Sequence, residues 1–176
     1  KALAKAHDAG VVHRDIKPDN LFICDPDGDA HVKVLDFGVA KSDDSDLAMT
    51  STGAIVGTPY YMSPEQLLSA KHVDLRSDLW SLGVVAYHAL AGQRPFEAET
   101  FPGLVVAIER GYYPLPFERL GLGTPEIDAW VSRALNRDIE QRFSSAAEMA
   151  SALELAAGLP PAPHASFSQI SAPEHD

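Results

Sequence analysis

The stretch VVHRDIKPDN, residues 11–20, joins a helical pattern to a β-like pattern and so decides the fold of this 176-residue chain. Before it, residues 1–9 carry a short apolar stripe of helical spacing, which Gly10 can end in a left-handed conformation. After it come two β-like runs, Leu21 to Ile23 and Val32 to Leu35, separated by the strong turn sequence DPDGD. The chain is therefore predicted to pass from a helix through a polar loop into a β-hairpin.

The open end of this predicted hairpin gathers residues that can handle a phosphoryl group. Asn20 stands just before the first run and Asp36 just after the second, so antiparallel pairing brings them to the same end, on strands about 5 Å apart. Amide and carboxylate oxygens are hard ligands suited to Mg²⁺. In the same loop, Asp15 could orient or deprotonate a hydroxyl group, and Lys17 could neutralise charge on a transferring phosphoryl group.

Three ordered motifs resemble those of protein kinases: HRDIKPDN at residues 13–20, DFG at residues 36–38 and GTPYYMSPE at residues 57–65. The resemblance covers about residues 1–158. Within this range the sequence is most similar to bacterial, eukaryotic-like serine/threonine protein kinases. It implies ATP and Mg²⁺ as cofactors and proteins as substrates. By the same resemblance, Asp15 is the expected catalytic base and Lys17 the expected contact to the γ-phosphate. Asn20 and Asp36 are the expected ligands of Mg²⁺.

The resemblance also assigns residues around the loop that follows DFG. Thr58 resembles the threonine that braces the catalytic loop beneath the shelf for the substrate peptide. Arg14 resembles the arginine that receives a phosphate from the loop, and Lys41 is a second candidate cation for it. Thr50 and Thr52 are the candidate phosphorylation sites, and the alternative is that they are ordinary polar loop residues.

Four residues are expected to support the fold: His13, Glu65, Asp78 and Arg142. In the family, His13 packs under the DFG region, and Asp78, at the start of a central helix, holds the backbone of the HRD motif. Glu65 pairs there with the buried Arg142, and the loss of one partner of such a pair costs roughly 3–5 kcal/mol.

Ser63 stands where the family pattern has alanine, which is a small change. His7 and His88 have no evident partner in the sequence.

The remainder of the chain predicts helices. Residues 77–91 are apolar nearly all round, as expected of a helix in the centre of a domain. Other helices are expected over residues 101–111, from Pro125 to about Leu135, and after a capping box formed by Ser145 and Glu148.

The expected fold class is α+β: a protein kinase-like, mostly helical C-terminal lobe with a small β-hairpin, over residues 1–158. Residues 159–176 are rich in Pro, Ala and Ser and are expected to form a linker or tail. The glycine-rich loop and strand lysine of a kinase N-terminal lobe are not found in the sequence. We therefore expect the N-lobe to be absent and the isolated chain to be inactive.

The composition of the chain limits the kinds of partner it can bind and the cellular compartment it fits. The net charge of −11 argues against nucleic acid or an anionic membrane as the main partner. The single cysteine, Cys24, excludes an internal disulfide framework and fits a reducing compartment. The longest apolar stretch, Trp80 to Gly92, is shorter than the roughly 20 residues that span a bilayer. A cytoplasmic kinase domain is expected, with any membrane anchor beyond residue 176.

Three functions remain open from the sequence. The first is an active serine/threonine kinase, whose self-association could support autophosphorylation in trans. The second is a pseudokinase-like regulatory or binding module, which the presence of Asp15, Lys17, Asn20 and Asp36 disfavours. The third is a small-molecule phosphotransferase of related fold, which the peptide shelf at residues 57–65 disfavours.

Overall fold

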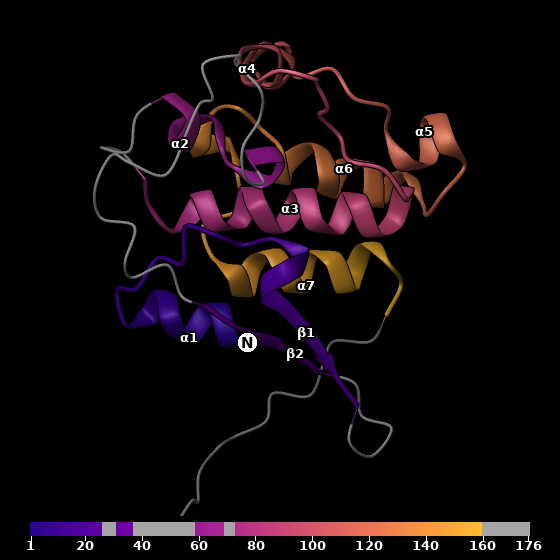
Figure 1. Ribbon diagram of the computed structural model, residues 1–176. Coiled ribbons are helices and arrows are strands. Elements are labelled where there is room, and N and C mark those ends of the chain that lie inside the picture. The colour runs from indigo at the N-terminus through magenta and orange to yellow at the C-terminus, as the bar shows by residue number, and fades with distance from the viewer. Residues whose placement is uncertain (26–30, 37–58, 69–72, 160–176) are drawn as a thin grey trace, which may run out of the picture.

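Helix α3 (Leu75–Ala91) runs through the centre of the molecule, and the other elements pack around it in this computed structural model (Figure 1). The structure describes residues 1–25, 31–36, 59–68 and 73–159. Asp74 caps α3 by accepting a hydrogen bond from the Arg76 amide at 2.8 Å, and Gly92 ends it with a φ of 69°. The predicted central helix is thus confirmed. It begins two residues earlier than predicted because the side chain of Asp74 satisfies its first turn.

The predicted hairpin is also confirmed. Strand β1 (Leu21–Cys24) pairs antiparallel with β2 (His31–Val34), with Leu21 opposite Val34. The short 3₁₀ helix η1 (Pro18–Asn20) leads into it, and the Leu35 amide donates to the Asn20 carbonyl at 2.9 Å. This extra bond continues the ladder past the strands, so Asn20 and Asp36 flank the same end of the hairpin.

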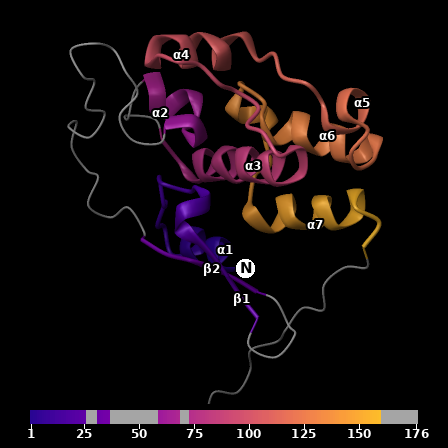
Figure 2. The ribbon, with the colours of Figure 1, turned by 45° about the vertical axis from the view of Figure 1, so that its right-hand side comes forward.

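The remaining elements form two sides around α3. Helix α1 (Ala2–Asp8) and the hairpin lie on one side, and α4 (Phe101–Arg110) lies on the other in both views (Figures 1 and 2). The other elements are η2 (Pro59–Tyr61), α2 (Pro64–Leu68), α5 (Pro116–Leu120), α6 (Pro125–Ala134), η4 (Ile139–Gln141) and α7 (Ala146–Ala156). Helices α4, α6 and α7 match their predicted ranges. Helices α2 and α5 were not predicted, because five residues are too few to show a periodic pattern.

The predicted capping box of α7 is only half present. The Glu148 amide donates to the Ser145 hydroxyl at 3.1 Å, as a capping box requires. The Glu148 carboxylate, however, accepts from the amide and hydroxyl of Ser144, each at 2.7 Å, and not from the Ser145 amide. The helix therefore begins where predicted, with a different reciprocal bond.

The core is formed where α3 meets α6, α5 and η2, and where α6 in turn packs against α7. The fully buried apolar side chains of α3 are Leu79, Trp80, Val84 and Tyr87. Gly83 allows the closest approach between the helices, because a Cβ added there would lie 2.9 Å from the Ala134 Cβ of α6. Among the described residues, no helix is long and apolar enough to cross a membrane.

Candidate active site

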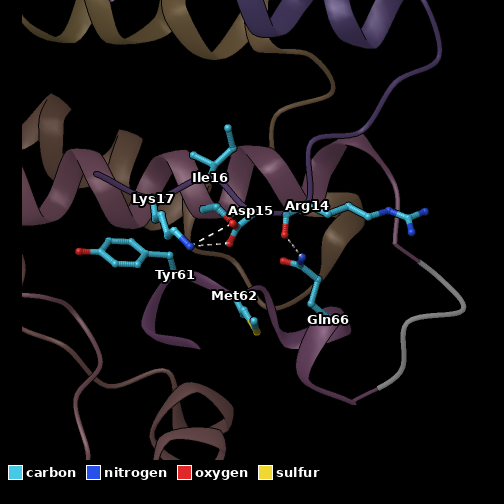
Figure 3. Close-up of a pocket in the computed structure, with 8 residues that line it drawn as sticks. Arg14, Asp15, Ile16, Lys17, Tyr61, Met62 and Gln66 are labelled. Carbon is cyan, nitrogen blue, oxygen red and sulfur yellow. Dashed lines mark hydrogen bonds and ion pairs between the residues drawn. The ribbon is translucent and has the colours of Figure 1, made fainter. Parts of the chain in front are cut away.

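Asp15, Lys17 and Asn20 lie in mutual contact at the start of the hairpin. The Lys17 Nζ is 3.2 Å and 3.0 Å from the two carboxylate oxygens of Asp15 (Figure 3). The Asn20 Nδ2 donates to the Asp15 backbone carbonyl at 2.8 Å and to its Oδ2 at 3.1 Å. The carboxylate of Asp15 is therefore fixed between a cation and an amide donor, while remaining partly exposed to an incoming group.

Asp78 fixes the backbone that presents Asp15. From the first turn of α3, its Oδ2 accepts from the His13 amide and its Oδ1 from the Arg14 amide, both at 2.8 Å. Arg14 has a φ of 64°, a left-handed conformation that is uncommon outside glycine. Such a conformation persists where the surroundings hold it, and the buried carboxylate of Asp78 supplies that restraint.

His13 connects the loop of residues 13–20, the predicted catalytic loop, to the end of the hairpin. Its side chain is fully buried. The Asp15 amide lies 3.2 Å from His13 Nδ1, and His13 Nε2 lies 2.9 Å from the Leu35 carbonyl. A single neutral tautomer satisfies both contacts, with Nδ1 accepting and Nε2 donating. His13 thus connects Asp15 with the residue that precedes Asp36.

Two histidines have partners that the sequence did not reveal, so the expectation that they lack one was wrong. His7 Nε2 lies 2.9 Å from Asp78 Oδ2, and the two side chains are only 5% and 1% exposed. His88, near the end of α3, lies with its Nδ1 3.0 Å from the Tyr61 hydroxyl. Burial raises the pKa of the Tyr61 hydroxyl above its ordinary value of 10.0. No sequence signal could have found either pair, because the partners lie 71 and 27 residues apart.

The hairpin end offers two oxygen ligands. Both side-chain hydrogen bonds of Asn20 among the described residues use its Nδ2, which leaves its amide Oδ1 available. Asp36 is exposed and has a φ of 52°. The described residues contain no group of three acidic, His or Cys side chains able to hold a metal. These two side chains fit Mg²⁺, because that ion is usually held by one or two protein groups plus phosphate oxygens and water.

A small pocket opens beside Asp15 (Figure 3). Its lining comes from the catalytic loop, from the segment around α2, and from α3: Arg14, Asp15, Ile16, Lys17, Tyr61, Met62, Gln66 and Ser81. Tyr61 and Met62 belong to the segment that the sequence assigns to the peptide shelf. The structure therefore brings part of that shelf against the predicted catalytic base.

Glu65 and Arg142 form a bidentate ion pair behind the shelf. Arg142 Nη1 and Nη2 lie 2.8 Å and 2.9 Å from the two Glu65 oxygens, and Ser77 Oγ donates to Glu65 Oε1 at 2.6 Å. Arg142 is 3% exposed. Burial opposes ionisation of Glu65, but the bonds and charge of Arg142, with the Ser77 bond, prevail and lower its pKa. The charged pair is thus a fixed link between α2 and the segment before α7.

Most residues predicted to act in the loop after DFG lie outside the residues that the structure describes. These are the candidate phosphorylation sites Thr50 and Thr52, the cation Lys41, and Thr58 of the shelf. Arg14 is described and exposed, and its guanidinium extends away from Asp15 (Figure 3). The roles assigned to Arg14 and to the four residues outside the described ranges therefore stay predictions.

Comparison with known proteins gives a consistent result. A profile of the protein kinase domain family matches residues 1–153. The chain is 44% identical over 156 residues to the serine/threonine-protein kinase Pkn1 of Myxococcus xanthus, covering 88% of this chain and 22% of that protein. It is 39% identical over 150 residues to the serine/threonine-protein kinase PknB of Mycolicibacterium smegmatis, covering 85% of this chain and 23% of the relative. The chain thus spans less than a quarter of the length of these two curated relatives.

Proposed function

The chain belongs to the protein kinase domain family, and from this premise we propose that it forms part of a serine/threonine protein kinase. The proposed reaction is transfer of the γ-phosphoryl group of ATP to a protein hydroxyl in the presence of Mg²⁺. The observation that carries the proposal is the contact between Asp15, Lys17 and Asn20, held on a backbone that Asp78 fixes. Phosphoryl transfer depends mainly on positioning and on electrostatic stabilisation, and this arrangement supplies both.

Each residue has a defined task in this proposal. Asp15 orients the substrate hydroxyl and accepts its proton as the new oxygen–phosphorus bond forms and the bond to ADP breaks. Lys17 compensates negative charge on the transferred group. Its contact with Asp15, at 3.0 Å, supports this task, because it holds the ammonium group beside the carboxylate proposed to receive the proton. Asn20 and Asp36 would hold Mg²⁺, which neutralises charge on the ATP phosphates when bound.

The apolar surface of the hairpin supports a binding role for a flat, apolar group. Phe22, Ile23, Val32 and Leu35 are 54%, 78%, 53% and 40% exposed. Ile23 lies directly opposite Val32 in the hairpin, so these two exposed side chains share one face, and contiguous exposed apolar side chains mark a ligand or protein contact. We place adenine and a second kinase lobe on this surface in the full-length enzyme. On this view, the 176 residues alone lack one wall of the nucleotide site and transfer little or no phosphate.

Phosphorylation of Thr50 or Thr52 is the proposed activating step. A phosphate carries a charge of about −2 and three acceptor oxygens, which an exposed arginine can bind. Arg14 meets this description, and Lys41 lies in the sequence between the DFG motif and Thr50. Self-association of two copies would allow each to phosphorylate the other. Phosphosite mapping of the active full-length protein tests this step, and an active protein unmodified at both threonines would reject it.

The decisive experiment compares the full-length protein with its Asp15→Asn variant. Asparagine keeps the size of the side chain but cannot accept the hydroxyl proton as a carboxylate does. We expect phosphate transfer from radiolabelled ATP to a protein substrate to fall by at least about 100-fold, in line with general base catalysis. Asp138→Asn, at the exposed cap of η4, is the matched control. A full-length wild type without transfer would favour the pseudokinase-like alternative.

A further inference from the structure

We propose that Gln66 is a positioning residue that clamps the backbone of the catalytic loop and couples it to the peptide shelf. Gln66 lies in α2, directly after Glu65. The inference rests on the proposed function, because it assigns a residue to the same site. Its test nevertheless includes a readout that does not depend on activity.

The side-chain amide of Gln66 bridges two segments of the chain. Its Nε2 donates to the Arg14 carbonyl at 2.9 Å, across 52 residues of sequence (Figure 3). Its Oε1 accepts from the amide of Ser63 at 3.0 Å and from its hydroxyl at 3.1 Å. One end of the amide group therefore holds the shelf segment, while the other end holds the catalytic loop.

The bond to the Arg14 carbonyl acts on the peptide plane that precedes Asp15. The oxygen of this plane is held by Gln66, and its N–H, which belongs to Asp15, points to His13 Nδ1 at 3.2 Å. The amide of Arg14 itself is held by Asp78 at 2.8 Å. The left-handed residue is thus fixed on both sides, by α3 at its nitrogen and by α2 at its oxygen.

The chemistry of the bridge requires glutamine. Ser63 and Gln66 form a capping box, in which the Gln66 amide lies 3.4 Å from the Ser63 hydroxyl and the Gln66 side chain returns to the Ser63 amide. Glutamate serves in a capping box as well as glutamine does, because it also accepts. Only glutamine has an N–H that can donate to a carbonyl at the same time. The Gln66→Glu variant therefore keeps the cap of α2 and removes the bond to Arg14.

This difference separates a positioning role from a merely structural one. If Gln66 only caps α2, Gln66→Glu will behave as the wild type, and Gln66→Ala will lose thermal stability. If Gln66 positions Asp15, Gln66→Glu will lower kcat with little change in the KM for ATP. The expected loss in kcat is about 3- to 10-fold, the size of one net hydrogen bond. Gln141→Glu, which introduces the same charge at an exposed glutamine of η4, is the matched control.

The experiment measures kcat, both KM values, the melting temperature and hydrogen exchange of the Asp15 amide in full-length protein. The inference is supported if Gln66→Glu shows both a lower kcat and faster exchange of the Asp15 amide, while Gln141→Glu shows neither change. Unchanged exchange overturns it, even if kcat falls, since added charge would then be the cause. If the Asp15 amide of Gln66→Glu exchanges faster but kcat is unchanged, the claim that Gln66 positions Asp15 for catalysis is overturned. If the wild type transfers no phosphate and Asp15→Asn is no different, the proposed function fails, and the exchange measurement alone decides the clamp.

Discussion

His7 of α1 and Asp78 of α3 form a buried contact, with His7 Nε2 2.9 Å from Asp78 Oδ2. The carboxylate of Asp78 also accepts from the amides of His13 and Arg14. The other nitrogen of His7, Nδ1, is buried and has no hydrogen-bond partner among the described residues. The contact between these two side chains therefore depends on one particular ring nitrogen.

Two substitutions of His7 should differ for this reason. The Nε2 of glutamine lies about as far from the backbone as the Nε2 of histidine, whereas the amide of asparagine matches the unpartnered Nδ1. We expect His7→Gln to keep most of the stability and His7→Asn to lose about 1–3 kcal/mol, because it leaves Asp78 short of one buried donor. Urea unfolding of the two variants under identical conditions measures the difference. Equal losses in both would show that the bond from Nε2 has no special weight.

Removal of Arg142 should destabilise the protein far more than removal of another paired arginine. Arg142→Ala leaves the Glu65 carboxylate uncompensated behind the shelf, with an expected loss of about 3–5 kcal/mol. The comparison is Arg133→Ala, because Arg133 pairs with Glu148 at the surface, where both side chains are at least one-third exposed. Such pairs contribute about 0–1 kcal/mol. Denaturant titration distinguishes the two, and similar losses would contradict the structural weight given to the buried pair.

The Glu65 pair also predicts how stability depends on pH. The pKa of Glu65 is lowered in the folded state from its ordinary value of 4.5, so the folded protein holds the charged form more firmly than the unfolded chain does. Its contribution is complete above about pH 4.5 and is lost as the pH falls through the lower, folded value. In Glu65→Gln, the free energy of unfolding should fall less steeply with acid across this interval. Curves of equal slope for wild type and variant would contradict the prediction.

Gly83 tests the approach of α3 to α6. In Gly83→Ala the new Cβ would lie 2.9 Å from the Ala134 Cβ, so the two helices must separate. Overpacking of this kind costs about 1–3 kcal/mol. Adding Ala134→Gly removes the opposing methyl group. The double variant should then be more stable than the sum of the two single losses predicts, which thermal unfolding of all four proteins measures. Additive losses would place the strain elsewhere.

The sequence predicted those features that depend on neighbours along the chain. The turn between the two β-like runs defined the hairpin, and through it the shared location of Asn20 and Asp36. The proline at the first helical position, Pro125, marked the start of α6, where the Thr124 hydroxyl accepts from the Ile127 amide three residues on. Local chemistry of this kind can be read directly from residue order.

Contacts that only the folded chain creates could not be predicted in this way. His7 and His88 gain partners through the packing of helices, and no spacing in the sequence announces it. The capping box of Ser63 and Gln66 differs, because its three-residue spacing is a local signal that the sequence does contain. The bond from Gln66 to Arg14 requires that α2 lie against the catalytic loop, which is a property of the tertiary fold.

The position of Asp78 has a consequence for local unfolding. One buried carboxylate joins α1, the catalytic loop and the central helix, so the loop cannot open without disturbing the packed interior. Surface loops usually exchange their amide hydrogens through small fluctuations that leave the rest of the protein folded. The amides of His13 and Arg14 are instead expected to exchange at rates close to those of α3. In this protein, the segment that holds Asp15, the proposed catalytic base, would unfold together with the core.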